Sequence, residues 1–121
     1  MGDNGSYKSL IVWQKAVDLV LRIYETTKCF PFEEKYGLSS QMRRAAVSIP
    51  SNIAEGHERH TTREFILGVS HAQGSAAELE TQLTIAVRLG ICPDALGEEV
   101  SNLIAEVRRL LNSLRRKLET L

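Results

Sequence analysis

The sequence predicts an all-α protein, an up-and-down four-helix bundle with a left-handed superhelical twist. Glycine and proline residues divide the chain into four long segments, and apolar residues recur within each segment at spacings of three and four. No stretch alternates between apolar and polar residues for long enough to predict a β-strand. The connections are short, so consecutive helices should be antiparallel neighbours.

The composition is that of one globular domain. The 121 residues include 15 Lys+Arg and 15 Asp+Glu, and 43% are hydrophobic, which excludes a disordered chain. We find no apolar run long enough to cross a membrane and no signal-peptide core, so we expect a cytoplasmic protein. In that compartment Cys29 and Cys92 should remain unpaired thiols. We assign residues 1–8 to a flexible N-terminal tail and residues 9–121 to a single domain.

The first helix is expected from about Ser9 to Cys29. It should end before Phe30-Pro31, because a residue that precedes proline disfavours the α conformation. Its apolar residues cover an arc of about 200°, whereas packing on one side needs roughly 100° or a little more. The excess predicts a contact with another subunit. The residues of this arc are Leu10, Val12, Trp13, Ala16, Val17, Leu19, Val20, Leu21, Ile23 and Tyr24.

The second helix contains a proline. Ser39 or Ser40 can cap its start, and Pro50 lies within its apolar pattern. A proline there removes a backbone hydrogen bond and clashes with the preceding turn, so we expect a kink or a break. Asn52 lies at the edge of the apolar face and needs a hydrogen-bond partner if it is buried. The stretch from Gly56 to Thr62 is predicted to be a loop.

The third helix has a well-defined start. Thr61 and Glu64 have the spacing of a capping box. Apolar or small residues then follow a heptad pattern until Gly90, and the small residues in the middle predict close approach of a neighbouring helix. The pattern is formed by Phe65, Val69, Ala72, Ala76, Leu79, Leu83 and Ala86, and the small stretch is Ala72, Gly74, Ser75, Ala76 and Ala77.

The fourth helix should open at Pro93 or Asp94, since both suit a first turn. Its predicted heptad seam is broadened on one side by further apolar residues. The seam consists of Val100, Leu103, Val107, Leu110 and Leu114, and the broadening residues are Ile104, Leu111 and Leu118.

The sequence contains no strong candidate for a catalytic site or a metal-binding site. His57 and His60 with His71 lack the accompanying ligands of a known metal site, so we interpret them as solvated loop residues. Three glutamates could supply acid–base chemistry, but nothing in their spacing selects them, and neither a nucleophile turn nor a phosphate-binding glycine loop is present. We therefore expect no enzymatic activity, no metal and no cofactor. These glutamates are Glu55, Glu78 and Glu80.

A basic stretch in the fourth helix is the strongest sign of a binding function. Between Val107 and Lys117 there are five basic residues and no acid, in two rows one heptad apart that we expect to point outward. Such rows can contact phosphates, and they can equally complement the negative C-terminal end of the helix. The five residues are Arg108, Arg109, Arg115, Arg116 and Lys117, and Arg43 with Arg44 forms a second basic spot.

Several sequence runs match one family. The chain resembles the four-helix-bundle proteins encoded in intervening sequences of bacterial 23S rRNA genes, from about Leu10 to Leu114. The most specific run is Ser-Ile-Pro-Ser-Asn-Ile-Ala-Glu-Gly, residues 48–56. The other matching runs are residues 12–16, Phe30-Pro31, Tyr36-Gly37-Leu38, residues 41–47, Gly74-Ser75 and residues 78–83.

The resemblance implies a homopentamer. The resemblance also includes related proteins that accompany the reverse transcriptases of diversity-generating retroelements. Those relatives are basic and bind nucleic acid, whereas this chain has a net charge of zero. Four polar residues fall within or beside the matching runs, and we interpret them as a structural motif, with ligand contact as the alternative. They are Asn52, Glu55, Ser75 and Glu78.

We base the expected function on the basic stretch of the fourth helix and on the family resemblance. We expect a non-enzymatic homo-oligomer, with a pentamer implied by the resemblance, that contacts RNA or a nucleoprotein through the basic residues of the fourth helix. The alternative is a protein-binding scaffold without a nucleic-acid role. The zero net charge excludes a uniformly basic binder but not a local basic patch repeated around a ring.

Overall fold

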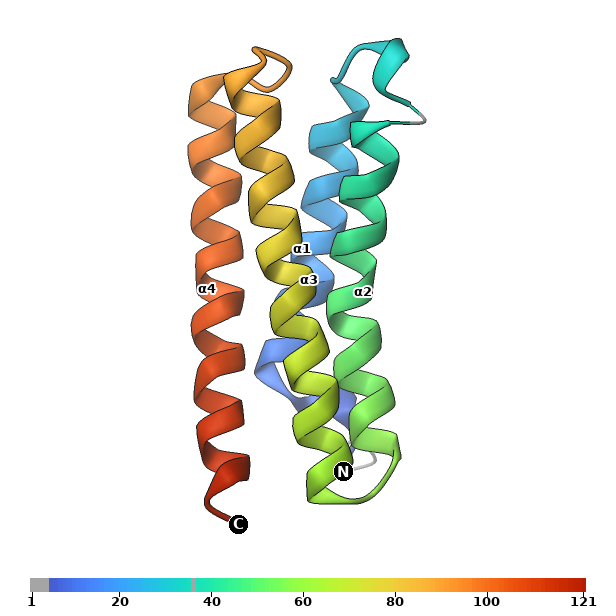
Figure 1. Ribbon diagram of the computed structural model, residues 1–121, viewed down its shortest axis with the longest axis vertical. Helices are drawn as coiled ribbons and strands as arrows, with labels where there is room; N and C mark the ends of the chain where they lie inside the picture. The colour runs from blue at the N-terminus through green and yellow to red at the C-terminus, as the bar shows by residue number, and fades with distance from the viewer. Residues whose placement is uncertain (1–4, 36) are drawn as a thin grey trace.

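A computed structural model describes residues 5–35 and 37–121, and four long helices dominate it. They are α1 (Ile11–Lys28), α2 (Leu38–Glu58), α3 (Thr62–Arg88) and α4 (Asp94–Glu119). Figure 1 shows them running alternately up and down, with the end of the chain at the same end of the bundle as the α2–α3 turn. The described residues contain no strand. The predicted all-α four-helix bundle is confirmed.

Two short 3-10 helices accompany the bundle. η1 (Tyr7–Ser9) precedes α1, and η2 (Phe32–Glu34) lies in the α1–α2 connection. The ring of Tyr7 packs edge-on against Trp13, with 5.4 Å between centroids, so this part of the predicted tail lies against the bundle. Residues 1–4 of that tail, and Tyr36, fall outside the described residues.

Each helix packs against its neighbours in chain order, and α4 closes the ring against α1. The α2–α3 contact is the most extensive. In α3 the predicted seam is buried from Val69 to Ala86. In α4, Val100 and Val107 of the predicted seam are buried, whereas Leu103, Leu110 and Leu114 are half-buried and pack against the edge of the core. The core side of α4 is formed by Val100, Ile104, Val107, Leu111 and Leu118.

The start of α2 differs from the prediction. The cap residue is Gly37, without a side-chain cap, so neither Ser39 nor Ser40 has the predicted role. Instead, the amide of Leu38 donates to Oε1 of Glu34 at 3.3 Å. The helix then continues through Pro50 as one element, which rules out a break there. Pro50 is buried, so packing holds the helix together where one hydrogen bond is lost.

The predicted loop beginning at Gly56 is wrong, because α2 continues to Glu58. Gly56 faces Gly68 of α3, and the two backbones approach closely. A Cβ on Gly68 would lie only 2.6 Å from the carbonyl oxygen of Asn52, so glycine is required by space. Gly74, expected at a close approach, faces open space instead, since a Cβ added there would meet no described atom within 4 Å.

The turn between α2 and α3 is short and capped. His60 adopts a positive φ of 65°, and α3 follows directly after Thr61. The amide of Glu64 donates to Oγ1 of Thr61 at 3.1 Å, which confirms the Thr61 half of the predicted capping box, whereas the Glu64 side chain makes no return hydrogen bond to a described residue. Within the described residues, none of the helices combines the length and the apolar character needed to span a membrane.

Candidate nucleic-acid interface

The basic residues of α4 lie on two different sides of the helix. Arg108 donates to Oε1 of Glu80 at 2.6 Å, and Arg115 donates to Oε1 of Gln73 at 2.9 Å. Both partners belong to α3, so this row joins the two helices instead of pointing outward as expected. Arg115 also contacts Glu119 at 3.3 Å. The α3–α4 packing therefore occupies one of the two predicted rows.

Arg109, Arg116 and Lys117 form the other group, which we call the α4 cationic strip. All three are exposed. None of them makes a hydrogen bond or an ion pair with any residue in the described part of the chain. Their charges are thus available to a partner outside the chain. The sequence identified these residues but did not separate them from Arg108 and Arg115.

A groove that contains no residue of the strip lies between the start of α3 and Arg115 of α4. Its cavity volume is about 500 Å³. Two arginines, Arg63 and Arg115, line it together with the hydroxyl-bearing Thr61 and Ser70. Guanidinium and hydroxyl groups are hydrogen-bond donors suited to phosphate and ribose oxygens. The remaining lining residues are Glu64, Ile66 and Leu67.

Ion pairs organise the side of α4 that faces α1. Arg22 of α1 donates to Glu99 at 2.5 Å, and Lys15 lies 3.8 Å from Glu106. The hydrogen bond to Glu99 raises the pKa of the Arg22 guanidinium above its usual value. Glu99 and Glu106 of α4 thus meet bases of α1, while the bases near the C-terminal end of α4 are exposed or contact Glu80, Gln73 or Glu119.

The second basic spot is divided in the same way. Arg43 donates from Nε to Oγ1 of Thr27 at 2.8 Å, and its guanidinium lies 4.5 Å from the ring centroid of Tyr24. Both partners belong to α1, so Arg43 joins α1 to α2. Arg44 is exposed, and no interaction with a described residue involves it.

Two residues of the predicted polar motif lie together, and two lie apart. Nδ2 of Asn52 donates to the carbonyl and hydroxyl oxygens of Ser48, each at 2.8 Å. The Ser48 hydroxyl lies 2.8 Å from that of Ser75, so Ser48 links α2 to α3. Sequence reasoning missed Ser48, although its position one turn before Asn52 was a signal. Glu55 and Glu78 are exposed; Glu55 lies 3.7 Å from Arg59, and Glu78 accepts from Gln82 at 3.4 Å.

Of the three histidines predicted to be solvated loop residues, His60 is exposed in the α2–α3 turn as predicted, whereas His57 and His71 lie within helices. His57 lies in the last turn of α2, where its ring packs edge-on against Phe65 at 5.3 Å and Tyr7 at 6.3 Å. Its Nδ1 is 3.3 Å from Oε2 of Glu58. His71 lines a small pocket of about 140 Å³ with Glu55 and other α2 and α3 residues. In the described ranges, no three His, Cys, Asp or Glu side chains are arranged to hold a metal ion.

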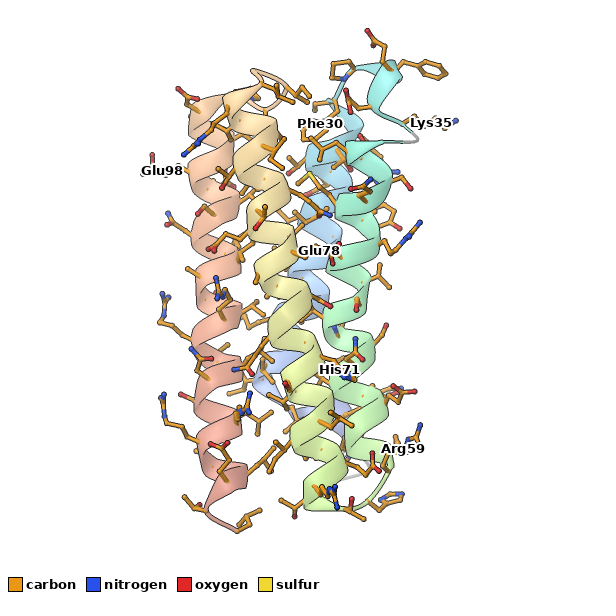
Figure 2. All side chains as sticks on the ribbon, in the orientation of Figure 1. Phe30, Lys35, Arg59, His71, Glu78 and Glu98 are labelled. Atoms are coloured by element: carbon orange, nitrogen blue, oxygen red, sulfur yellow. The ribbon has the colours of Figure 1, made fainter. Side chains whose placement is uncertain are left out.

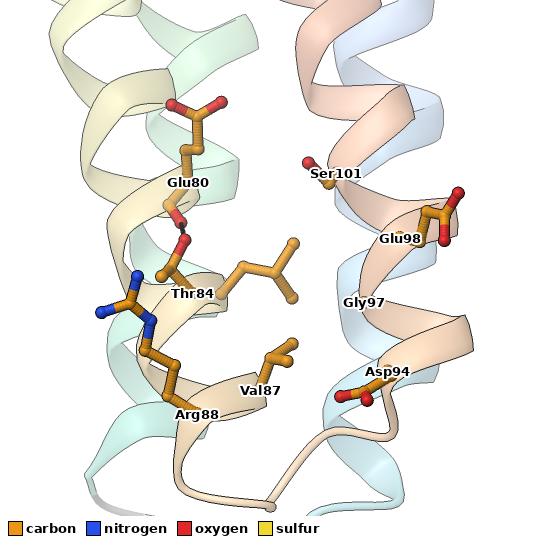
Figure 3. A pocket seen from close by; sticks show the side chains of 9 residues that line it. Glu80, Thr84, Val87, Arg88, Asp94, Gly97, Glu98 and Ser101 are labelled. Atoms are coloured by element: carbon orange, nitrogen blue, oxygen red, sulfur yellow. Dashed lines mark hydrogen bonds between the residues drawn. The ribbon is translucent and has the colours of Figure 1, made fainter.

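A further pocket of about 240 Å³ lies between the last turns of α3 and the first turns of α4 (Figure 3). Glu80, Asp94 and Glu98 give it an acidic lining, with Arg88 at its edge. A Cβ on Gly97 would lie 2.5 Å from Cγ2 of Val87, so this glycine allows α4 to approach α3. This pocket carries the opposite charge from the α4 cationic strip.

Comparisons with known proteins agree with this fold. No curated protein gave a match. One solved structure is that of a protein of unknown function from the S23 ribosomal protein family of Bacteroides thetaiotaomicron, with a TM-score of 0.78 and 25% identity. The match covers 87% of this chain and 98% of that one. The sequence pattern of the 23S rRNA-intervening sequence proteins matches residues 8–113, and the chain therefore belongs to that family.

Proposed function

We propose that the chain is a subunit of a non-enzymatic homopentamer that contacts RNA phosphates through the α4 cationic strip. The observation that carries this proposal is the strip itself. Three exposed cations lie within nine residues of one helix, and none has a partner in the described part of the chain. The groove at the same end of the bundle adds Arg63 of α3, whereas Arg115, which also lines it, is already bonded to Gln73 and Glu119.

Assembly increases the effect of a small patch. Each cation that neutralises a phosphate releases counterions, which makes the affinity depend on salt. Five copies on one ring bind an RNA multivalently, and avidity of this kind can exceed the affinity of a single patch by a factor of about 100 or more. This is how a chain with zero net charge can bind a polyanion.

The apolar surface beside α2 supports self-association. Leu21 and Tyr24 of α1 are 61% and 40% exposed, and Val47 of α2 is 40% exposed. The opposite side of α1 is occupied by its ion pairs with α4. A second copy that covers these apolar side chains removes them from water, and burial of this kind drives most protein association. We call these three residues the apolar flank.

The test of RNA contact is binding to a single-stranded RNA over a salt series. We compare Arg109→Gln/Arg116→Gln with a matched control, Arg44→Gln/Arg88→Gln, which removes the same charge from exposed positions nearer the other end of the bundle. The strip variant should bind at least about tenfold more weakly at low salt and show a shallower salt dependence, by about 0.7 in slope for each lost phosphate contact. The control should retain the wild-type slope.

Equal losses in both double variants would show that overall charge, and not the strip, governs binding. Absence of binding by the wild-type protein at low salt would also contradict the proposal. Both variants remove solvated side chains only, so their melting temperatures should match that of the wild type.

A protein-binding scaffold is the second candidate. It is favoured by exposed apolar side chains on α3, Leu67 and Ile85, which are 50% and 45% exposed. Capture of one specific protein that resists nuclease treatment, and is lost in Ile85→Gln, would favour this function over RNA contact.

A further inference from the structure

A second cationic pocket lies where α1 connects to α2, at the end of the bundle opposite the α4 cationic strip. Figure 2 labels Phe30 and Lys35 at this end. The cavity volume is about 220 Å³, which leaves room for one phosphoryl group. Three lining residues are cations and none is an acid: Thr27, Lys28, Phe30, Pro31, Phe32, Lys35, Ser39 and Arg43.

Ser39 provides an unpartnered hydroxyl in this pocket. The residue is only 5% exposed, and its hydroxyl makes no hydrogen bond with any residue of the ranges 5–35 and 37–121. Among the described residues, the one fully buried side-chain polar atom without a partner is Oε1 of Gln82, so the Ser39 hydroxyl is accessible from the pocket that it lines. The Glu34 carboxylate already accepts from the first amide of α2. The Ser39 hydroxyl is therefore the group at the start of α2 that remains able to donate to an anion.

Arg43 lies one turn after Ser39 and is held in a fixed orientation. Its Nε donates to Thr27, its Nη2 donates to the carbonyl of Tyr24 at 3.4 Å, and its Cζ lies over the Tyr24 ring, 4.5 Å from the centroid. Nη1 makes no hydrogen bond within the described ranges. A guanidinium fixed in this way loses little entropy on binding, and its planar donors match phosphate oxygens.

The other charged groups at this end leave the pocket positive. Lys28 lines the pocket and has no ion pair with a described residue. Lys35 lies 5.7 Å from the ring centroid of Phe32 at the edge. Glu34 belongs to η2, its Oε1 accepts from the Leu38 amide of α2, and it does not line the cavity. An anion in the pocket therefore meets cations and hydroxyls.

We infer that this pocket binds a phosphate monoester dianion. The Ser39 hydroxyl and the Arg43 guanidinium donate to its oxygens, and Lys28 and Lys35 balance its charge. The site is separate from the α4 cationic strip, so an experiment can contradict one of the two proposals and leave the other intact. The phosphoryl group can be free phosphate or the 5′-phosphate of an RNA, and the experiment distinguishes these sources.

The first experiment is calorimetric titration with inorganic phosphate at constant ionic strength, with chloride as the reference anion. The wild-type protein should bind one phosphate per chain, and Ser39→Ala and Lys28→Gln should each weaken binding about fivefold or more. Arg44→Gln is the matched control, because it removes a cation next to Arg43 that does not line the pocket. The tests use Ser39 and Lys28 because Arg43 also joins α1 to α2.

The second experiment compares an RNA that carries a 5′-phosphate with the same RNA that carries a 5′-hydroxyl. A preference for the phosphorylated end that Lys28→Gln abolishes supports the site with RNA as the source. Equal binding of both RNAs, together with saturable binding of inorganic phosphate, supports it with free phosphate as the source. No saturable phosphate binding, or equal weakening in Arg44→Gln, overturns the inference. Arg109→Gln/Arg116→Gln should bind inorganic phosphate like the wild type.

Discussion

Glycine residues determine how closely α2 and α3 pack. At Gly56 and Gly68 the two backbones are so near that a methyl group on either would contact the opposite helix at 3.0 Å or less. The sequence showed Gly56 only as a helix breaker, because pairing with Gly68 depends on the alignment of two helices. Gly74 illustrates the reverse case: it lies in a small-residue stretch but faces open space.

Gly68→Ala should lower the free energy of unfolding by about 2 kcal/mol or more, since the added methyl group meets backbone atoms that cannot move independently. Gly74→Ala should raise it by about 0.5–1 kcal/mol, because alanine favours an exposed helical position over glycine. Chemical denaturation of both variants measures the difference. Equal stabilities would contradict the predicted close contact.

Asn52 should stabilise the α2–α3 contact through Ser48. Asn52→Ala removes two hydrogen bonds to Ser48 and should lower the stability by about 1 kcal/mol. Glu55→Ala, which removes only a surface ion pair 3.7 Å long, is the control and should cost less than about 0.5 kcal/mol. A melting temperature of Asn52→Ala equal to that of the wild type would show that the motif has no structural role.

The two cysteines should react at very different rates. Cys29 is exposed and Cys92 is buried, and burial raises the pKa of the Cys92 thiol, which keeps it protonated. A thiol reagent added to the native protein should modify Cys29 rapidly and Cys92 only after unfolding. Because the folded state holds the Cys92 proton more tightly than the unfolded state, stability should fall at alkaline pH. Rapid modification of both thiols would contradict this burial.

At the scale of the elements, local chemistry predicted some helix ends and missed others, since the cap of α2 is Gly37 and not Ser39 or Ser40, and α2 continues past Gly56 to Glu58. The Thr61 cap and the stop before Phe30-Pro31 depend on neighbours in sequence, and both are confirmed. The core side of α4 could not be identified in the same way, because its apolar arc is broad. Only packing against α1 and α3 selects Ile104 and Leu111 over Leu103 and Leu110.

The same limit applies to the candidate site. The sequence identified all five bases of α4, because an acid-free run is visible without a structure. It did not separate the row that bonds Glu80 and Gln73 from the exposed strip, since that depends on the alignment of α3 with α4. The pocket around Ser39 and Lys28 was missed, because its residues come from two helices and a connection.

Arg108 and Arg109 should therefore behave differently despite being neighbours. Arg108→Gln breaks a half-exposed ion pair with Glu80 and should lower stability by up to about 1 kcal/mol while leaving most RNA affinity. Arg109→Gln should leave stability unchanged and weaken RNA binding. Thermal melts and RNA titrations of the two single variants measure this. The opposite pattern would contradict the assignment of the two rows.

For the whole molecule, a zero net charge conceals an uneven distribution. Acids of α4 face bases of α1, the α3–α4 pocket near the opposite end is acidic, and exposed cations gather towards the C-terminal end of α4. The apolar flank of α1 and α2 remains exposed in one chain. The proposed assembly would both cover the flank and repeat the strip around a ring, which increases the avidity for a polyanion.

Leu21→Arg tests the flank directly, since it places a charge where a second copy is proposed to pack. The variant should fold with little change in monomer stability, because Leu21 is 61% exposed in one chain. It should fail to assemble and should bind RNA with the weak affinity of one patch. Lys28→Gln, away from the flank, should assemble normally.

The most direct measurement is sedimentation equilibrium of the pure wild-type protein without any ligand. The account predicts a single species with a mass close to five times the 13.5 kDa of one chain. A 13.5 kDa monomer over the whole micromolar range would contradict it, because the apolar flank would then face water and the cationic strip would act alone.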